Sequence, residues 1–167
     1  MMMIKLAELT RELAIPNNMR VKMSHGPITP NKSKTYEQQP TMKPRGFWYG
    51  FGNEWIEWVR ENMPEWEGDY LYEVDIKHLN VLLIKSYDEL VLFDKTYAAT
   101  ASKHGFPRDP GEAIDWSAVS QKYDGVEIYP YERGNRHQYS WYSTWSVASG
   151  CIWNLSHIEL KQIEPKL

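Results

Sequence analysis

The stretch Gly46-Phe47-Trp48-Tyr49-Gly50-Phe51-Gly52-Asn53 decides how the rest of the chain is interpreted. Aromatic residues between glycines are typical of a short strand that ends in a turn. Asn53 is then a candidate N-cap for a helix that ends before Pro64. The buried face of this helix is predicted to carry Trp55, Ile56, Val59 and Met63.

On both sides of this stretch, strand and helix patterns are interleaved irregularly. The predicted strands are 19–24, 70–76, 81–84, 126–129, 149–154 and 158–163, and the predicted helices are 4–15, 86–97 and 116–123. Ser86 with Glu89 fits a capping box, and Asp115 is a candidate N-cap. The irregular order predicts an α+β fold and does not support a doubly wound sheet.

The chain of 167 residues is expected to form one domain over 1–167, with an N-terminal helix within 1–16. Residues 27–45 contain four prolines without periodicity, which predicts a long functional or mobile loop. Residues 98–111 and 130–140 are also predicted to be loops. No internal repeat and no linker between two cores is evident.

Composition excludes several classes of protein. The net charge of −3 argues against broad, nonspecific nucleic-acid binding. The single cysteine cannot form an internal disulfide, no apolar run approaches about 20 residues, and no signal peptide is recognised. We therefore expect a cytoplasmic protein without a membrane partner. The aromatic content of 14% exceeds what a core of this size requires.

Common cofactor and metal motifs are absent. No P-loop occurs, and Gly46, Gly50 and Gly52 lack the spacing of the dinucleotide fingerprint. The five histidines are scattered, so no metal site is expected. Cys151 begins an apolar strand, which favours a small buried residue over a nucleophile.

Three features then follow in a suggestive order: Ser24-His25-Gly26 at a strand end, Gly46-Phe47-Trp48-Tyr49, and a strand with Glu127 before Cys151-Ile152-Trp153-Asn154. This order resembles the ADP-ribosyltransferase superfamily, on the branch of diphtheria toxin and the poly(ADP-ribose) polymerases. Residues 43–58 and 141–154 also look like small phage and bacterial proteins of that superfamily. The resemblance implies one domain with split mixed or antiparallel sheets and flanking helices around an NAD cleft.

The resemblance also implies roles for individual residues. His25 would orient the ribose of NAD, and Gly26 would clamp the nicotinamide amide. Trp48 or Tyr49 would stack on the nicotinamide ring, and only one of them can face the cleft because strand neighbours point to opposite faces. Ser24, Gly46 and Ser149 complete the expected cofactor site.

A carboxylate is expected because breaking the bond between nicotinamide and ribose develops positive charge on the sugar. The family's glutamate falls at or near Ser149, which is not an acid, so Glu127 is the candidate in its place. His25, Tyr49 and Glu127 are thus the expected catalytic residues. Each also has an ordinary interpretation, as a strand end before a turn, core packing and a solvated strand residue, respectively.

The resemblance favours an NAD-dependent mono-ADP-ribosyltransferase, such as a toxin or phage effector, with NAD as co-substrate, no metal, and an antitoxin or inhibitor as a further partner. Its macromolecular target, protein or nucleic acid, would contact Arg133, Arg136, Tyr139 and Trp141, unless this loop is simply solvated. Lys43 and Arg45 would contact the NAD pyrophosphate or solvent. The alternatives are a non-catalytic NAD-, ADP-ribose- or protein-binding module on the same fold, and an interaction protein whose aromatic residues form an interface.

Overall fold

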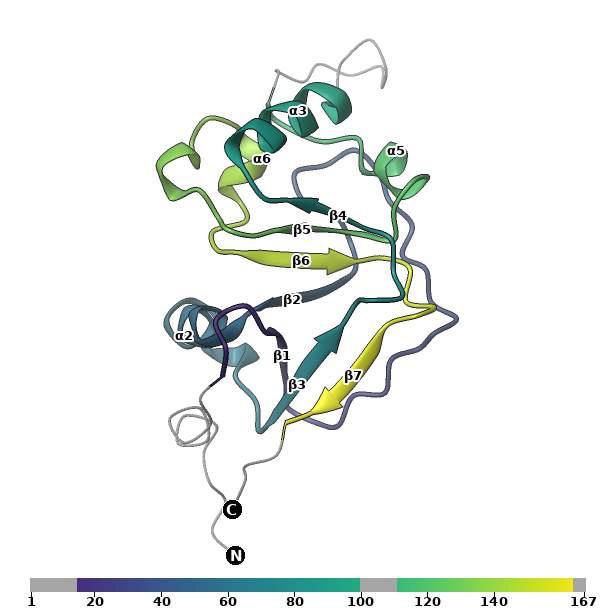
Figure 1. Ribbon diagram of the computed structural model, residues 1–167, viewed down its shortest axis with the longest axis vertical. Helices are drawn as coiled ribbons and strands as arrows, with labels where there is room; N and C mark the ends of the chain where they lie inside the picture. The colour runs from purple at the N-terminus through teal and green to yellow at the C-terminus, as the bar shows by residue number, and fades with distance from the viewer. Residues whose placement is uncertain (1–14, 100–110, 164–167) are drawn as a thin grey trace, which may run out of the picture.

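A computed structural model describes residues 15–99 and 111–163 of the protein. The helix predicted over 4–15 lies outside the described residues, apart from the buried Ile15. The described part is a mixed α+β structure built around one sheet (Figure 1). The predicted α+β class is therefore confirmed.

The sheet contains seven strands. They are β1 (Arg20–Ser24), β2 (Phe47–Phe51), β3 (Tyr70–Asp75), β4 (Val81–Ile84), β5 (Gly125–Ile128), β6 (Ser149–Ile152) and β7 (Glu159–Gln162). Their order across the sheet is β4-β5-β6-β2-β1-β3-β7. All neighbours are antiparallel except β4 and β5, which are parallel. Each predicted strand is present, within a few residues of its expected ends.

Among the strand pairs of the described sheet, β1 and β2 share the fewest ladder pairs. These strands share two ladder pairs, Arg20 with Phe51 and Val21 with Gly50. Beyond them β1 continues to pair with β3, whereas β2 continues to pair with β6. The structure therefore differs from the expected split sheets: two half-sheets, β4-β5-β6-β2 and β1-β3-β7, remain joined at a two-pair seam.

The helices lie on different half-sheets (Figure 1). They are α2 (Gly52–Asn62), α3 (Tyr87–Tyr97), α5 (Trp116–Ser120) and α6 (Ser140–Ser143), with short 3₁₀ turns at Pro64–Trp66 and Arg133–Asn135. Helix α2 lies beside β1 and β2, and the other three lie beside β4, β5 and β6. Helix α6 and the second 3₁₀ turn include part of a segment that was predicted to be only a loop.

The predicted N-caps are confirmed at Ser86 and Asp115 but not at Asn53. The Ser86 hydroxyl accepts from the Glu89 amide at 3.2 Å, but the Glu89 carboxylate accepts from the Lys85 amide rather than returning the bond to Ser86. Asp115 accepts from the Ala118 amide, as predicted. The prediction for Asn53 is wrong, because α2 already begins at Gly52 and its N-cap, Phe51, makes no side-chain cap.

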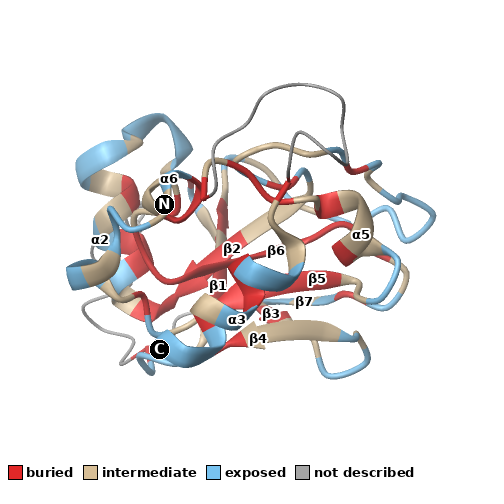
Figure 2. Ribbon diagram, turned by 90° about the horizontal axis from the view of Figure 1, so that it is seen from above, coloured by how far each residue is buried: buried red, intermediate tan, exposed pale blue. Residues whose placement is uncertain are grey.

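Two apolar clusters account for much of the aromatic content, and the buried residues lie along the central strands (Figure 2). The larger cluster includes Trp116, Trp141 and Trp153 and packs under α3, α5 and α6. The smaller cluster packs Trp55, Ile56 and Val59 of α2 against Val21 and Leu71 of β1 and β3. Core packing, rather than ligand binding, therefore explains most of the tryptophans.

Two glycines allow rings to cross strands closely. A Cβ at Gly50 would lie 2.1 Å from Trp55 Cδ2, and a Cβ at Gly150 would lie 2.3 Å from Tyr49 Cζ. Gly50 and Tyr49 are adjacent on β2, so these contacts are on opposite faces of the sheet. The absence of both side chains lets α2 approach one face and Tyr49 cross β6 on the other.

We predict that Gly150→Ala destabilises the protein, because its methyl group would overlap the Tyr49 ring. Overpacking at such a site costs about 1–3 kcal/mol of unfolding free energy. Urea denaturation followed by circular dichroism measures this loss. Gly134→Ala is the matched control, since a Cβ at Gly134 meets no atom within 4 Å. Equal midpoints for the two variants would contradict the close crossing of Tyr49 over Gly150.

Candidate functional site

A cavity opens where β1 and β2 diverge, beside α2. It encloses about 370 Å³. Its walls are the end of β1, the start of β2, α2 and the 3₁₀ turn after it, and the lining residues are Lys22, Met23, Ser24, His25, Gly46, Trp48, Trp55, Val59, Glu65 and Trp66. The cavity lies past Val21 and Gly50, where no further ladder pair joins β1 to β2.

His25 lies at the exposed end of this cavity. Its Nε2 donates to the backbone carbonyl of Glu65, 2.5 Å away. Because a carbonyl only accepts, Nε2 carries the proton, and Nδ1 of the neutral ring is an acceptor. The neighbouring Ser24 hydroxyl donates to the carbonyl of Gly26 at 2.7 Å, which fixes the turn that follows β1.

Trp48 is the member of the aromatic pair that lines the cavity. Its indole packs against Trp145 in an edge-on arrangement, with ring centroids 4.9 Å apart. The Lys43 ammonium lies 5.4 Å from the Trp48 ring centroid. The indole is therefore held in place by the core while it remains only partly buried.

Lys22 and Lys43 add positive charge near the cavity. Lys22 lines the cavity, and its ammonium lies 4.9 Å from the Phe47 ring centroid. Lys22 is half-buried, and burial lowers its pKa, whereas Lys43 is exposed. Within the described residues, neither lysine forms an ion pair with a carboxylate. A half-buried cation without a counter-ion, such as Lys22, favours an anionic group on a ligand.

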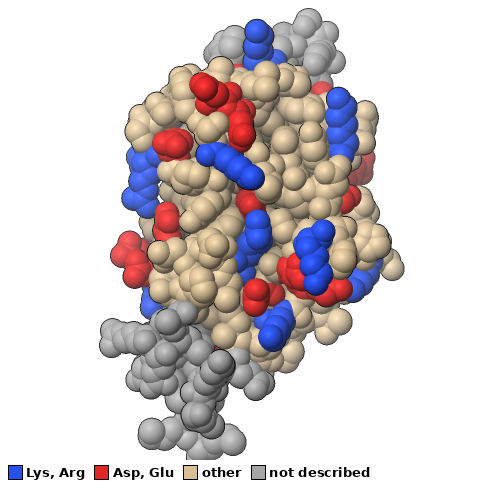
Figure 3. Space-filling model, viewed as in Figure 1, with Lys and Arg blue, Asp and Glu red and all other residues tan. Residues whose placement is uncertain are grey.

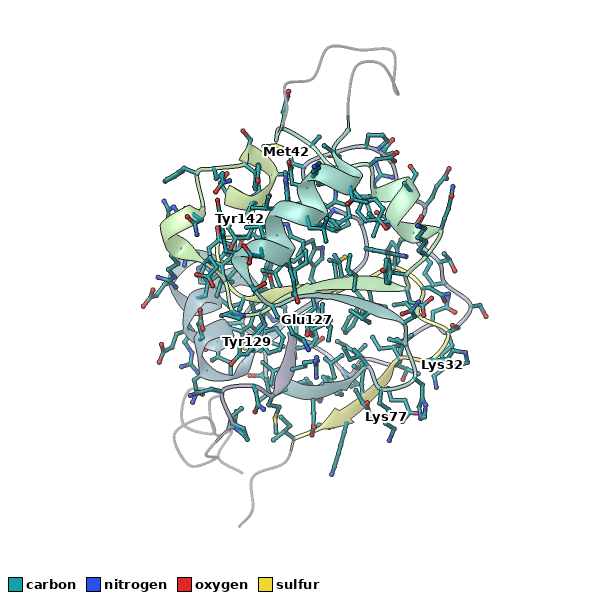
Figure 4. All side chains as sticks on the ribbon, turned by 45° about the horizontal axis from the view of Figure 1, so that its top comes forward. Lys32, Met42, Lys77, Glu127, Tyr129 and Tyr142 are labelled. Carbon is teal, nitrogen blue, oxygen red and sulfur yellow. The ribbon has the colours of Figure 1, made fainter. Side chains whose placement is uncertain are left out.

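Tyr49 and Glu127 belong to a different cluster, on the opposite face of β2. The Tyr49 hydroxyl donates to Glu127 Oε1 at 2.8 Å. Arg20 donates to both carboxylate oxygens, from Nε at 2.5 Å and from Nη2 at 3.0 Å. Figure 4 shows Glu127 inside the molecule, between β5 and β1, and the residue is only 5% exposed.

The electrostatics of this cluster suit a fixed ion pair. Burial, together with the Glu127 charge, raises the pKa of Tyr49 well above its ordinary value, so the phenol remains a donor. Burial alone would lower the pKa of Arg20, but its bonds to Glu127 outweigh burial and raise it. Arg20 comes from β1, Tyr49 from β2 and Glu127 from β5, so the cluster spans the seam.

The expected catalytic trio is therefore not assembled in one place. His25 and Trp48 share the cavity, whereas Tyr49 and Glu127 lie across the sheet from it. The expectation that Glu127 faces the NAD cleft with His25 is wrong, because its carboxylate is held by Arg20 and Tyr49. Glu127 is likewise not the solvated strand residue of the ordinary interpretation.

Of the remaining residues expected to bind the cofactor, some line the cavity and others do not. Ser24 and Gly46 line the cavity, whereas Gly26, directly after His25, is not among the lining residues. A Cβ at Gly46 would overlap the Ile152 carbonyl, so packing against β6 also requires this glycine. Ser149 is 1% exposed, and its hydroxyl donates to the Val147 carbonyl, so it is not part of the cavity wall.

The predicted target-contacting segment is only partly on the surface. Trp141 is fully buried, and its indole N–H donates to Asp94, so the prediction that it contacts a partner is wrong. Tyr139 stacks on Trp141 with ring planes 15° apart. Arg133 and Arg136 are exposed, and Arg133 lies 3.8 Å from Glu54 of α2.

Sequence reasoning missed Glu65 and Trp66 as cavity residues. They follow Pro64 in a 3₁₀ turn, a context that predicts only the end of a helix. Trp55 was predicted only on the buried face of its helix. It belongs to the smaller core cluster and also lines the cavity.

Within residues 15–99 and 111–163, no group of three or more His, Cys, Asp or Glu side chains is arranged to hold a metal ion. Cys151 is buried, and burial raises the pKa of its thiol well above the ordinary value. No helix among the described residues is long and apolar enough to span a membrane. On the face shown in Figure 3, acidic and basic side chains are intermixed.

Comparison of the chain with protein-family models, with curated proteins and with solved structures finds no match. A function for the chain is therefore inferred from the geometry of the cavity and from the motifs that line it.

We predict that Glu127→Gln and Tyr49→Phe both destabilise the fold, because each leaves a buried polar partner without its bond. The expected loss of unfolding free energy is about 1–3 kcal/mol for each variant. A double-mutant cycle by chemical denaturation should show that the two losses are not additive, since they share one network. Glu159→Gln, at an exposed carboxylate on β7, should change stability little. Wild-type stability in Glu127→Gln would show that the ion pair does not hold the seam.

Proposed function

We propose that the protein is an ADP-ribosyltransferase-like domain that binds the nicotinamide end of NAD in the cavity between β1 and β2, and transfers ADP-ribose to a macromolecular target. The observation that carries the proposal is that His25 and Trp48, from two separate motifs, line the same cavity. Trp55 and Trp66 add further indole surface to its walls.

Indole surfaces suit the nicotinamide ring of NAD because that ring is a cation while it is bonded to ribose. Aromatic faces attract cations by about 0.5–2 kcal/mol each, more in desolvated sites. When the bond to ribose breaks, the ring becomes neutral and this attraction is lost. The cavity would therefore hold NAD more firmly than the nicotinamide product.

The polar groups fit the neighbouring parts of NAD. His25 Nδ1 is free to accept from a ribose hydroxyl, because Nε2 is engaged with Glu65. Past Val21, the edges of β1 and β2 have no ladder partner in each other, so backbone groups there are placed to bind the carboxamide. Lys22 and Lys43 supply charge for the diphosphate.

In the proposed reaction, the bond between nicotinamide and ribose breaks and its electron pair leaves with nicotinamide. Positive charge develops on the ribose, and a nucleophile of the target then bonds to the ribose carbon and loses its proton. A nearby carboxylate stabilises this charge. Glu65 is the acidic residue among those that line the cavity, and we propose its carboxylate for the role that the sequence suggested for Glu127.

A second candidate is an NAD- or ADP-ribose-binding module without transfer activity. It is favoured by one observation: both oxygens of Glu127 are bonded within the fold, so β5 supplies no free carboxylate. Glu65 is exposed and comes from a short turn rather than from a strand, which makes it a less rigid stabiliser.

We predict that NAD binds with 1:1 stoichiometry in calorimetry and that two matched pairs of variants separate binding from folding. Gly26→Ala should weaken binding at least about fivefold, because the proposed contact of Gly26 with the nicotinamide amide needs close approach of the backbone, while Gly134→Ala should not. A Cβ at either glycine meets no atom within 4 Å, so neither change should affect stability.

The second pair of variants tests the histidine. His25→Ala should weaken NAD binding about fivefold through one lost hydrogen bond, whereas His157→Ala, at an exposed position elsewhere, should not.

Release of nicotinamide from NAD, measured with cell extract as a source of targets, distinguishes the two candidates. Release that Glu65→Gln abolishes and Glu127→Gln retains supports transfer with Glu65 as the stabiliser. Binding without release supports the non-catalytic module. No binding of NAD or ADP-ribose at millimolar concentration would overturn both.

A further inference from the structure

Aromatic and acidic side chains are combined on the exposed side of α2 and the turn that follows it. We call this surface the α2 patch and define it as Glu57, Trp58, Glu61, Glu65 and Trp66. Trp58 stacks on Trp55 with ring centroids 5.4 Å apart, and Trp66 lies 6.2 Å from Trp58. Trp66 is 46% exposed, so the row of indoles runs from the core to the surface.

The α2 patch lies in the most acidic part of the chain. Residues 52–69 contain six acidic residues and one arginine, a net charge of −5. Because the whole chain carries −3, the other residues together carry +2. The negative charge of the protein is therefore concentrated beside the cavity.

Two described arginines near the patch pair with carboxylates outside it. Arg60 pairs with Glu67, and Arg133 lies near Glu54, both outside the patch. Within the described residues, Glu57, Glu61 and Glu65 form no ion pair. Glu57 and Glu61 are four residues apart on α2, where like charges repel each other. This arrangement does not stabilise the helix, and a partner that supplies positive charge would relieve the repulsion.

We infer that the α2 patch docks a lysine- or arginine-rich segment of a protein partner. Indole faces bind guanidinium and ammonium groups, and carboxylates pair with the same groups, so both residue types of the patch favour one kind of side chain. A nucleic acid is disfavoured, because its phosphates would meet three carboxylates that form no ion pair with the described part of the chain.

The α2 patch adjoins the cavity. Glu65 and Trp66 belong both to the patch and to the cavity wall, so a docked segment reaches the mouth of the cavity. If the proposed function holds, the patch presents the protein target to bound NAD. Docking itself does not require NAD, so the two proposals can fail separately.

The experiment measures peptide binding to the full-length protein without NAD. The probes are an arginine–glycine repeat peptide, a glutamine–glycine peptide of equal length, and a single-stranded oligonucleotide. Binding is followed by calorimetry and by tryptophan fluorescence at low and high salt. We expect the arginine peptide alone to bind, with an affinity that falls as salt rises.

Variants then locate the site. Glu57→Gln combined with Glu61→Gln should weaken peptide binding about tenfold, as expected when two ion pairs at a partly screened surface are removed. Trp66→Ala should weaken it about 2- to 5-fold. Glu37→Gln combined with Glu159→Gln removes the same charge from exposed positions elsewhere and should bind as the wild type does.

Equal binding of the two peptides, preference for the oligonucleotide, or equal loss in both double variants would overturn the assignment. NAD affinity, measured in parallel, should be the same in the Glu57/Glu61 double variant and in the wild type. A protein that binds the arginine peptide but not NAD would overturn the proposed function and leave the docking surface standing.

Discussion

The hydrogen-bonded ion pair between Arg20 and Glu127, with Tyr49 as a second donor, is the interaction on which the architecture depends. Two backbone ladder pairs join β1 to β2 in the described sheet, α2 contacts both strands, and this network reaches from β1 over β2 and β6 to β5. It is possible because Gly150 has no side chain in its path. By holding the strands together on one face, it allows them to diverge beside α2 and leave a cavity there.

The α+β class, every strand of the sheet and the start of α3 could be predicted from local sequence, because alternation and capping are local signals. The continuity of the sheet could not, since the pairing of β2 with both β1 and β6 joins segments far apart in the chain. Helix α6 was missed for a different reason: its four residues carry no capping side chain, and buried aromatic contacts hold it instead.

The candidate site was half predictable. Strand alternation requires that Trp48 and Tyr49 face opposite ways, but it does not say which of them meets His25. Glu127 was chosen as the nearest strand carboxylate, yet the sequence does not show that Arg20 lies beside it after folding. An acidic residue on a strand can thus be a catalytic carboxylate or one half of a structural ion pair. Only the residue that lies beside it in the folded protein distinguishes the two roles.

The small number of hydrogen bonds between β1 and β2 links the binding of a small molecule at this place to the stability of the domain. Where the polypeptide omits hydrogen bonds between β1 and β2, a small molecule that contacts both edges would make some of them in its place. Its binding energy would then also resist separation of the two halves, and loss of the molecule would loosen the domain at one line rather than throughout.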